Sequence, residues 1–219
     1  MDKSCAIVIP AYKTRLTPFE KASYQRVRKV LGLRYDIFVV HPFGLDLTAY
    51  ALCRSIKMPE YYFKGRKEYS DLLKNPLFYS QFHNYEYVLI YQLDSWVFED
   101  RLQEFIRLGY DYIGAPHCQW MGDGPVVGNG GLSLRRVKAF EDVCTKYDLT
   151  GPGFRWEEDR AFTESQAAAD LNIAPLDVAF RFSVQDMFEE GMKANGWQMP
   201  FGTHQPDKFW PKWKKYIQI

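Results

Sequence analysis

The apolar run Tyr87–Tyr91, Tyr-Val-Leu-Ile-Tyr, restricts the possible folds of this chain more than any other segment. A continuous apolar run of this length is typical of a strand buried on both faces, as in a parallel sheet. Shorter β-branched runs at 6–9 and 37–40 have the same character. Because parallel strands must be joined by crossover connections, usually helices, these runs predict a layered α/β fold.

Helical signals occupy the segments between these strands. Thr17, Pro18 and Glu20 supply a cap residue, a first-turn proline and a capping-box glutamate, so a helix is predicted over Pro18–Leu31, ending at Gly32. Further helices are expected at 66–82, 101–108, 136–147 and 158–171, with another strand at 112–115. No shift in composition marks a boundary. We therefore predict one domain over residues 1–219, with a mostly parallel central sheet flanked by helices.

Composition excludes several classes of function. The 28 lysine and arginine residues balance 27 acidic residues, which leaves no basic footprint for a nucleic-acid partner. No stretch approaches the roughly 18 apolar residues that cross a bilayer, so we expect a cytoplasmic protein. The cysteines lack CxxC spacing and are expected to be reduced and structural: Cys5, Cys53, Cys118 and Cys144.

Ligands of open α/β sheets bind where loops leave the carboxyl ends of strands. This rule predicts that residues 10–13, 41–46, 92–96 and those from Pro116 onward are neighbours, which would place His41 and His117 near the site. Asp94 follows the most apolar strand directly. A carboxylate next to a buried strand is costly without a partner, so it should meet a metal, an arginine or solvent.

Five motifs in order along the chain resemble a bacterial family of largely uncharacterised glycosyltransferase-like domains with the GT-A fold, associated with capsule or lipopolysaccharide sugar assembly. They are Ile-Pro-Ala-Tyr-Lys near the start, Tyr-Gln-Leu-Asp-Ser-Trp-Val-Phe at 91–98, Tyr-Asp-Tyr-Ile-Gly-Ala-Pro at 110–116, Gly-Asn-Gly-Gly-Leu-Ser-Leu-Arg at 128–135 and Pro-Phe-Gly-Thr-His at 200–204. The resemblance implies a GT-A-like, Rossmann-like sheet. Its nucleotide-sugar half would cover about 1–100 and its acceptor half about 101–219.

The resemblance also implies a divalent metal, Mn²⁺ or Mg²⁺, that holds the diphosphate of a nucleotide sugar, UDP-linked by expectation. Gln92, Leu93 and Asp94 occupy the place of the acidic motif of GT-A enzymes, and glutamine replaces its first acid. Only Asp94 is therefore carried over as a ligand, and Gln92 is expected to contact the ribose or a metal-bound water. His204 corresponds to the late histidine that returns to the metal, although a lone histidine is more often a surface residue.

The acceptor half carries the remaining chemistry that the resemblance implies. Glu158 and Asp159 match an acidic pair at a helix start, where Asp159 would take the proton from the acceptor hydroxyl in an inverting transfer. Acidic residues are also frequent at helix starts for stability alone. Residues 128–131 are predicted to form a glycine-rich turn through which the backbone approaches the donor sugar and the acceptor. Gly130 and Gly131 are expected to contact the donor, and the residues expected to bind the acceptor are Trp120, Asn129 and Trp156.

Weaker candidates complete the donor site: Pro10, Tyr12, Lys13, Lys64 and Tyr69. Solvated lysines would look the same in the sequence. The tail at 208–216 alternates aromatic and basic residues, so it either rests on an anionic membrane surface at lipid-linked acceptors or covers the core.

The predicted function is metal-dependent hexosyl transfer from a nucleotide sugar to a glycan or lipid-linked acceptor in polysaccharide biosynthesis. The alternative is a catalytically silent module that binds a nucleotide sugar or a glycan. A nucleotidyltransferase is disfavoured because the first strand lacks a glycine-rich, basic loop.

Overall fold

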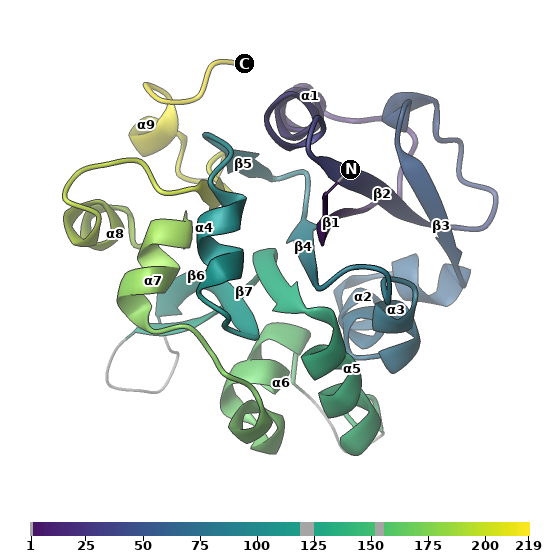
Figure 1. The fold of residues 1–219 in the computed structure, drawn as a ribbon. Coiled ribbons are helices and arrows are strands. Elements are labelled where there is room, and N and C mark those ends of the chain that lie inside the picture. The colour runs from purple at the N-terminus through teal and green to yellow at the C-terminus, as the bar shows by residue number, and fades with distance from the viewer. Residues whose placement is uncertain (1, 119–124, 152–155) are drawn as a thin grey trace.

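The computed structural model describes residues 2–118, 125–151 and 156–219. A six-stranded sheet crosses the molecule in the order β3-β2-β1-β4-β7-β6 (Figure 1). Its strands are β1 (Asp2–Pro10), β2 (Tyr35–Pro42), β3 (Arg54–Met58), β4 (Tyr87–Tyr91), β6 (Tyr112–Cys118) and β7 (Pro125–Arg136). Neighbouring strands are parallel except at β7, which is antiparallel to β4 and β6. The predicted single-domain α/β fold with a mostly parallel sheet is confirmed.

Successive side chains of β1 enter two different cores, because residues of a strand alternate between the faces of its sheet. Ile7 and Ile9 pack with α1 (Pro18–Leu31), α4 (Leu102–Arg107) and α7 (Leu176–Phe182). Ala6 and Val8 pack on the opposite face, against the helices α2 (Arg66–Leu73), α3 (Pro76–Ser80), α5 (Val137–Lys146) and α6 (Glu158–Glu164). Burial on both faces explains why these strands read as continuous apolar runs.

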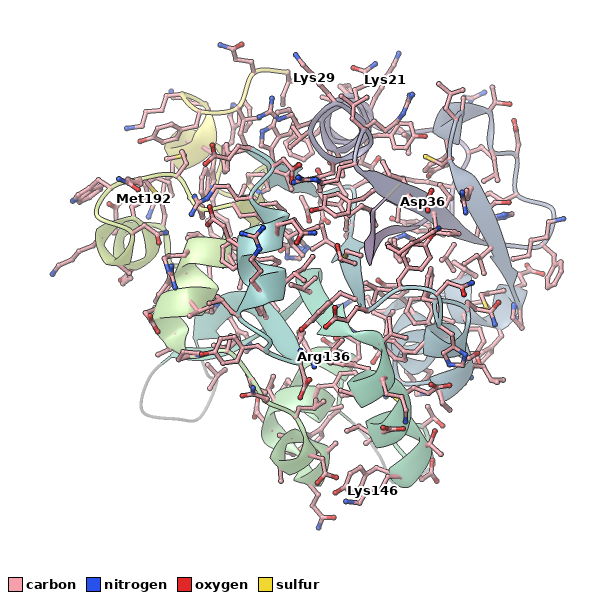
Figure 2. The ribbon with its side chains drawn as sticks, in the orientation of Figure 1. Lys21, Lys29, Asp36, Arg136, Lys146 and Met192 are labelled. Carbon is pink, nitrogen blue, oxygen red and sulfur yellow. The ribbon has the colours of Figure 1, made fainter. Side chains whose placement is uncertain are left out.

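Helix α1 has the predicted bounds, and its capping box is present. Thr17 Oγ1 accepts from the Glu20 backbone N–H at 3.2 Å, and Glu20 Oε2 accepts from the Thr17 N–H at 2.8 Å. At the other end, a Cβ on Gly32 would lie 2.6 Å from the Arg28 carbonyl oxygen, so the chain needs glycine there. Charged side chains of the outer face, such as Lys21, point away from the sheet (Figure 2).

Two predicted helices are shorter than expected. The stretch 66–82 divides into α2 and α3 because Pro76 has no N–H to continue a helix, and the Asn75 side chain accepts from the Leu77 N–H at 2.9 Å instead. The stretch 158–171 ends as an α-helix at Glu164. Ser165 there donates to the Ala161 carbonyl and caps a short 3₁₀ turn, η3 (Gln166–Asp170).

Two strand segments differ from or were absent in the sequence prediction. The glycine-rich segment 128–131, expected as a turn, lies inside β7. Strand β3 forms the parallel edge next to β2, and short 3₁₀ turns flank it: η1 (Thr48–Tyr50) and η2 (Glu60–Phe63). These segments lack a periodic apolar pattern, so only pairing with a neighbour defines them.

The last part of the chain joins the segment after β4 in a second, three-stranded sheet in the order β5-β9-β8. It consists of β5 (Ser95–Val97), β8 (Ser183–Val184) and β9 (Gly202–His204), accompanied by the helices α8 (Phe188–Ala194) and α9 (Trp210–Trp213).

Trp213 is fully buried, stacks on Phe98 and meets Phe188 edge-on. This residue of the aromatic tail therefore covers the core, whereas membrane contact stays a prediction. No helix among the described residues is long and apolar enough to cross a membrane.

Candidate active site

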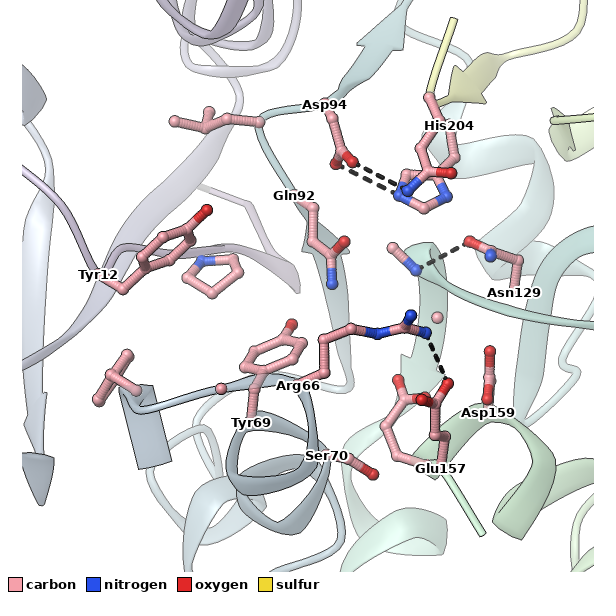
Figure 3. A pocket seen from close by; sticks show the side chains of 18 of the residues that line it. Tyr12, Arg66, Tyr69, Ser70, Gln92, Asp94, Asn129, Glu157, Asp159 and His204 are labelled. Carbon is pink, nitrogen blue, oxygen red and sulfur yellow. Dashed lines mark hydrogen bonds and ion pairs between the residues drawn. The ribbon is translucent and has the colours of Figure 1, made fainter. Parts of the chain in front are cut away.

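A pocket of about 650 Å³ opens at the carboxyl ends of β1 and β4 (Figure 3). Loops after both strands, β7, the start of α6 and the segment after β9 all contribute to its walls. The lining residues are Pro10, Tyr12, Lys13, Glu20, Tyr50, Tyr62, Phe63, Lys64, Gly65, Arg66, Tyr69, Ser70, Gln92, Leu93, Asp94, Asn129, Gly130, Gly131, Glu157, Glu158, Asp159, Gln185, His204, Gln205 and Lys208.

Backbone pairing brings Asp94 to His204. After β4 the chain turns with the Ser95 N–H donating to the Gln92 carbonyl at 2.9 Å, and it then enters β5. Strand β5 pairs with β9 so that Ser95 lies opposite His204. The Gln205 N–H donates to the Asp94 carbonyl at 2.7 Å and closes the arrangement. As a result, Asp94 Oδ1 lies 3.3 Å from His204 Nε2.

The imidazole of His204 is 4% exposed, and its two nitrogens have different surroundings. Nδ1 lies 3.1 Å from Gln185 Oε1, an amide oxygen that can only accept, so Nδ1 is the donor in this contact. Nε2 has no hydrogen-bond partner in the described part of the chain, although it faces the Asp94 carboxylate. Burial alone would raise the pKa of Asp94, but contacts with His204 and Gln205 outweigh it and hold that pKa below its ordinary value.

An imidazole nitrogen that lies close to a carboxylate oxygen is a suitable place for a cation, because both can be ligands to one metal. Two ligands at right angles, each about 2.1 Å from one cation, lie about 3.0 Å apart. The separation of Asp94 Oδ1 from His204 Nε2 is close to this value. Among the described residues, no cluster of three or more His, Cys, Asp or Glu side chains could hold a metal. The pair therefore fits an open cation site that needs further ligands from outside these side chains, and it does not fit a closed structural site.

The glycines of β7 leave room for two of the site's side chains. A Cβ on Gly131 would lie 2.1 Å from His204 Nε2, and a Cβ on Gly130 would lie 2.0 Å from Glu158 Oε1. The segment that was predicted as a turn is therefore part of a strand. Its glycines leave the space that the side chains of His204 and Glu158 occupy. Asn129 Oδ1 accepts from the Gly131 N–H at 3.0 Å and fixes this part of the wall.

Glu158 and Asp159 are neighbours at the start of α6, but their surroundings differ. Glu158 accepts a hydrogen bond of 2.5 Å from Arg135, whose guanidinium is fully buried and also donates to Tyr79 and Ser133. Asp159, by contrast, accepts from the backbone N–H of Arg160 at 2.8 Å. Burial, together with the negative charge of Glu158, raises the pKa of Asp159 from 3.8 to about 7. The pocket thus holds one carboxyl group that can gain or lose a proton near neutral pH.

Residues 53–204 match a family described as protein of unknown function, DUF5672. The match spans more than half of the chain. The chain belongs to DUF5672. No curated protein shows significant sequence similarity to it.

Solved glycosyltransferase structures share the fold of this DUF5672 protein. Galactosyltransferase LgtC in complex with donor and acceptor sugar analogues has a TM-score of 0.62 and 12% identity, over 98% of this chain and 97% of LgtC. A glycosyltransferase involved in glycosylation of the major capsid of PBCV-1 has a TM-score of 0.54 and 11% identity, over 91% of both chains. GlyE of Streptococcus pneumoniae TIGR4 has a TM-score of 0.55 and 12% identity, over 91% of this chain and 54% of GlyE. The fold is the GT-A glycosyltransferase fold that the resemblance implied.

Most predicted site residues of the DUF5672 protein line this one pocket: Pro10, Tyr12, Lys13, Lys64, Tyr69, Gln92, Leu93, Asp94, Asn129, Gly130, Gly131, Glu158, Asp159 and His204. Their roles as ligands, bases or sugar contacts stay predictions. Trp156 does not belong to the lining, because its carbonyl accepts from Lys74 at 3.2 Å and its ring lies against Arg160. Trp120 lies outside the described residues.

Two histidines expected beside the site of the DUF5672 protein, His41 and His117, are not among the described residues that line the pocket. His41 is a strand residue because β2 continues to Pro42, and only 2% of it is exposed. His117 likewise lies within β6, where it pairs with Val126 of β7. Both strands continue beyond the apolar runs that predicted them, so these histidines lie in strands and not in the loops that follow.

Sequence reasoning missed several lining residues of the DUF5672 protein, including Arg66, Glu157, Gln185, Gln205 and Lys208. Gln205 could have been found from its position next to His204, and Lys208 from the basic tail. Gln185 carried no signal, because it reaches the site only through the β8–β9 pairing.

Proposed function

We propose that this protein is a glycosyltransferase that transfers a hexose from a nucleotide sugar to a glycan or lipid-linked acceptor. Asp94 and His204 would hold a divalent cation, Mn²⁺ or Mg²⁺. The observation that carries the proposal is the 3.3 Å approach of Asp94 Oδ1 to the buried Nε2 of His204 at the strand-end pocket. No other described residue offers this nitrogen a hydrogen bond. Such a cation neutralises the charge of a leaving diphosphate.

The donor side of the pocket supports nucleotide binding. Tyr12 is 62% exposed and presents an aromatic face on which a base can stack. Lys13 lies 2.7 Å from Glu20 and 5.5 Å from the centre of the Tyr12 ring, which holds its ammonium at the wall. We assign Lys64 and Lys208, which line the same pocket, to the diphosphate of a UDP-linked donor.

Asp159 is the residue we assign as the base. In an inverting transfer, the acceptor oxygen bonds to the anomeric carbon as the bond from that carbon to the diphosphate oxygen breaks, and Asp159 takes the hydroxyl proton. A pKa of about 7 suits this task, because a base works best when its pKa is near the working pH. Glu158, which is paired with the buried Arg135, is better suited to holding the start of α6 against β7.

The test is an assay of UDP release from a panel of UDP-hexoses, with and without MnCl₂, followed by NMR of the anomeric configuration of any product. We expect Mn²⁺-dependent release, suppressed by EDTA and by Asp94→Ala, and an inverted product where an acceptor is supplied. Absence of both UDP release and any nucleotide-sugar-dependent rise of the Tm would overturn the proposal.

A silent nucleotide-sugar or glycan binding module is the second candidate. One observation favours it: the loop after β4 presents a single carboxylate to the pocket, Asp94, with the neutral Gln92 two residues before it. A module of this kind would show a nucleotide-sugar-dependent rise of the Tm but no UDP release, even with Mn²⁺ and after prolonged incubation.

A further inference from the structure

Gln205 directly follows His204 and has a backbone conformation that side chains seldom adopt. Its φ is +53°, and among the described residues only Leu52 and Trp197 also have a positive φ without being glycine. Those two residues are 87% and 64% exposed, whereas Gln205 lines the pocket. Non-glycine residues are retained in this region where surrounding contacts hold them, and they cluster at functional sites.

The contacts of Gln205 join two groups that the site uses. Its side-chain Nε2 donates to Asp94 Oδ2 at 3.2 Å, and its Oε1 accepts from Lys208 Nζ at 2.8 Å. Only one orientation of the amide satisfies both contacts, because the carboxylate can only accept and the ammonium can only donate. The backbone reinforces the arrangement, since the Gln205 N–H donates to the Asp94 carbonyl and its carbonyl accepts from the Lys208 N–H.

We propose that Gln205 is a positioning residue: its amide fixes the carboxylate of Asp94 and the ammonium of Lys208 relative to each other, so that both meet the same diphosphate. This inference rests on the proposed function, which assigns Asp94 to the cation and Lys208 to the phosphates. Gln205 itself touches neither the sugar nor the reacting atoms in this assignment. It orients a ligand in the way that hydrogen-bonding partners of metal ligands do.

The positive φ of Gln205 allows a substitution that distinguishes a positioning role from a purely structural role. Glycine adopts a positive φ more readily than glutamine, so Gln205→Gly removes the amide and relieves the backbone at the same time. Leu52→Gly is the matched control, because Leu52 also has a positive φ but its side chain is 87% exposed.

The experiment measures two quantities on the full-length wild type, Gln205→Gly and Leu52→Gly. The first is the Tm without ligand, and the second is the Kd of UDP in MnCl₂ by calorimetry. We expect both variants to melt at the wild-type temperature or up to about 3 °C above it. The Kd should rise about 10- to 100-fold in Gln205→Gly only, which is the scale for residues that orient metal ligands.

Each other outcome overturns the inference in a recognisable way. A Kd of Gln205→Gly within about twofold of the wild-type value would show that the amide positions nothing. A Tm lower than that of the wild type by several degrees, with no fall in Leu52→Gly, would make Gln205 a structural residue. If the wild type itself does not bind UDP with Mn²⁺, the proposed function fails as well, whereas in the first two outcomes only the role of Gln205 falls.

Discussion

Asp159→Asn should stabilise the protein at alkaline pH while it lowers transfer by about a hundredfold, the scale for loss of a general base. Burial and the charge of Glu158 raise the pKa of Asp159 from 3.8 to about 7 in the folded protein. Between about pH 4 and 7 the folded state therefore binds more protons at this site than the unfolded state, and stability falls as the pH rises. Above about pH 7 the full cost of ionising the carboxyl in the fold remains.

The pKa difference sets the size of the expected effect. A change from 3.8 to about 7 corresponds to about 4 kcal/mol as an upper limit. Because the Asp159 side chain is only partly buried, solvent screens part of this cost, and we expect a gain of about 1–3 kcal/mol at pH 8. In a protein of this size, 2 kcal/mol corresponds to a rise of the Tm of about 4–8 °C.

The assay is urea unfolding of the wild type, Asp159→Asn and Asp177→Asn at pH 5 and pH 8. Asp177 is the matched control, because it occupies the same first-turn position of α7 but is exposed. We expect the gain of Asp159→Asn to be larger at pH 8 than at pH 5, and we expect Asp177→Asn to lose a few tenths of a kcal/mol through the helix dipole. If Asp159→Asn behaves like the control at both pH values, the reasoning about its buried charge is refuted.

Three further substitutions test the site. Asp94→Ala should abolish Mn²⁺-dependent binding of UDP in calorimetry with little change in Tm; equal affinity in variant and parent would exclude Asp94 as a ligand. Gly131→Ala would bring a Cβ within 2.1 Å of His204 Nε2, so it should weaken Mn²⁺-dependent binding of UDP at least tenfold. Unchanged affinity would contradict the conclusion that this glycine leaves room for His204. Glu158→Ala leaves the buried Arg135 without its carboxylate and should lower the free energy of unfolding in urea by about 3–5 kcal/mol. The control Glu157→Ala removes an exposed carboxylate and should lower it by less than about 1 kcal/mol. Similar losses in the two variants would argue against a structural ion pair between Glu158 and Arg135.

Several parts of the candidate site could be predicted from the sequence because they depend on neighbouring residues. Asp94 follows an apolar strand directly, and the carboxyl ends of parallel strands meet at one edge of a sheet. The acidic pair at the start of α6 was recognised only through the family resemblance, and the sequence did not distinguish Glu158 from Asp159. Glu158 is paired with Arg135, which reaches α6 from β7, whereas burial is the main cause of the raised pKa of Asp159.

The sequence itself determined the bounds of α1 and β4 and the presence of β1 and β2, although both of these strands extend beyond their apolar runs. Their signals are local: a capping box joins residues three apart, and a run buried on both faces must be apolar throughout. The resemblance implied that His204 and Asp94 meet, but only the tertiary structure decided how they are brought together and that the glycines of β7 leave room for His204 and Glu158. The strands β5 and β9 that make this meeting are three residues long each, too short for a periodic pattern. They exist because each supplies the other's backbone hydrogen bonds across a long sequence separation, and no local signal encodes such a pairing.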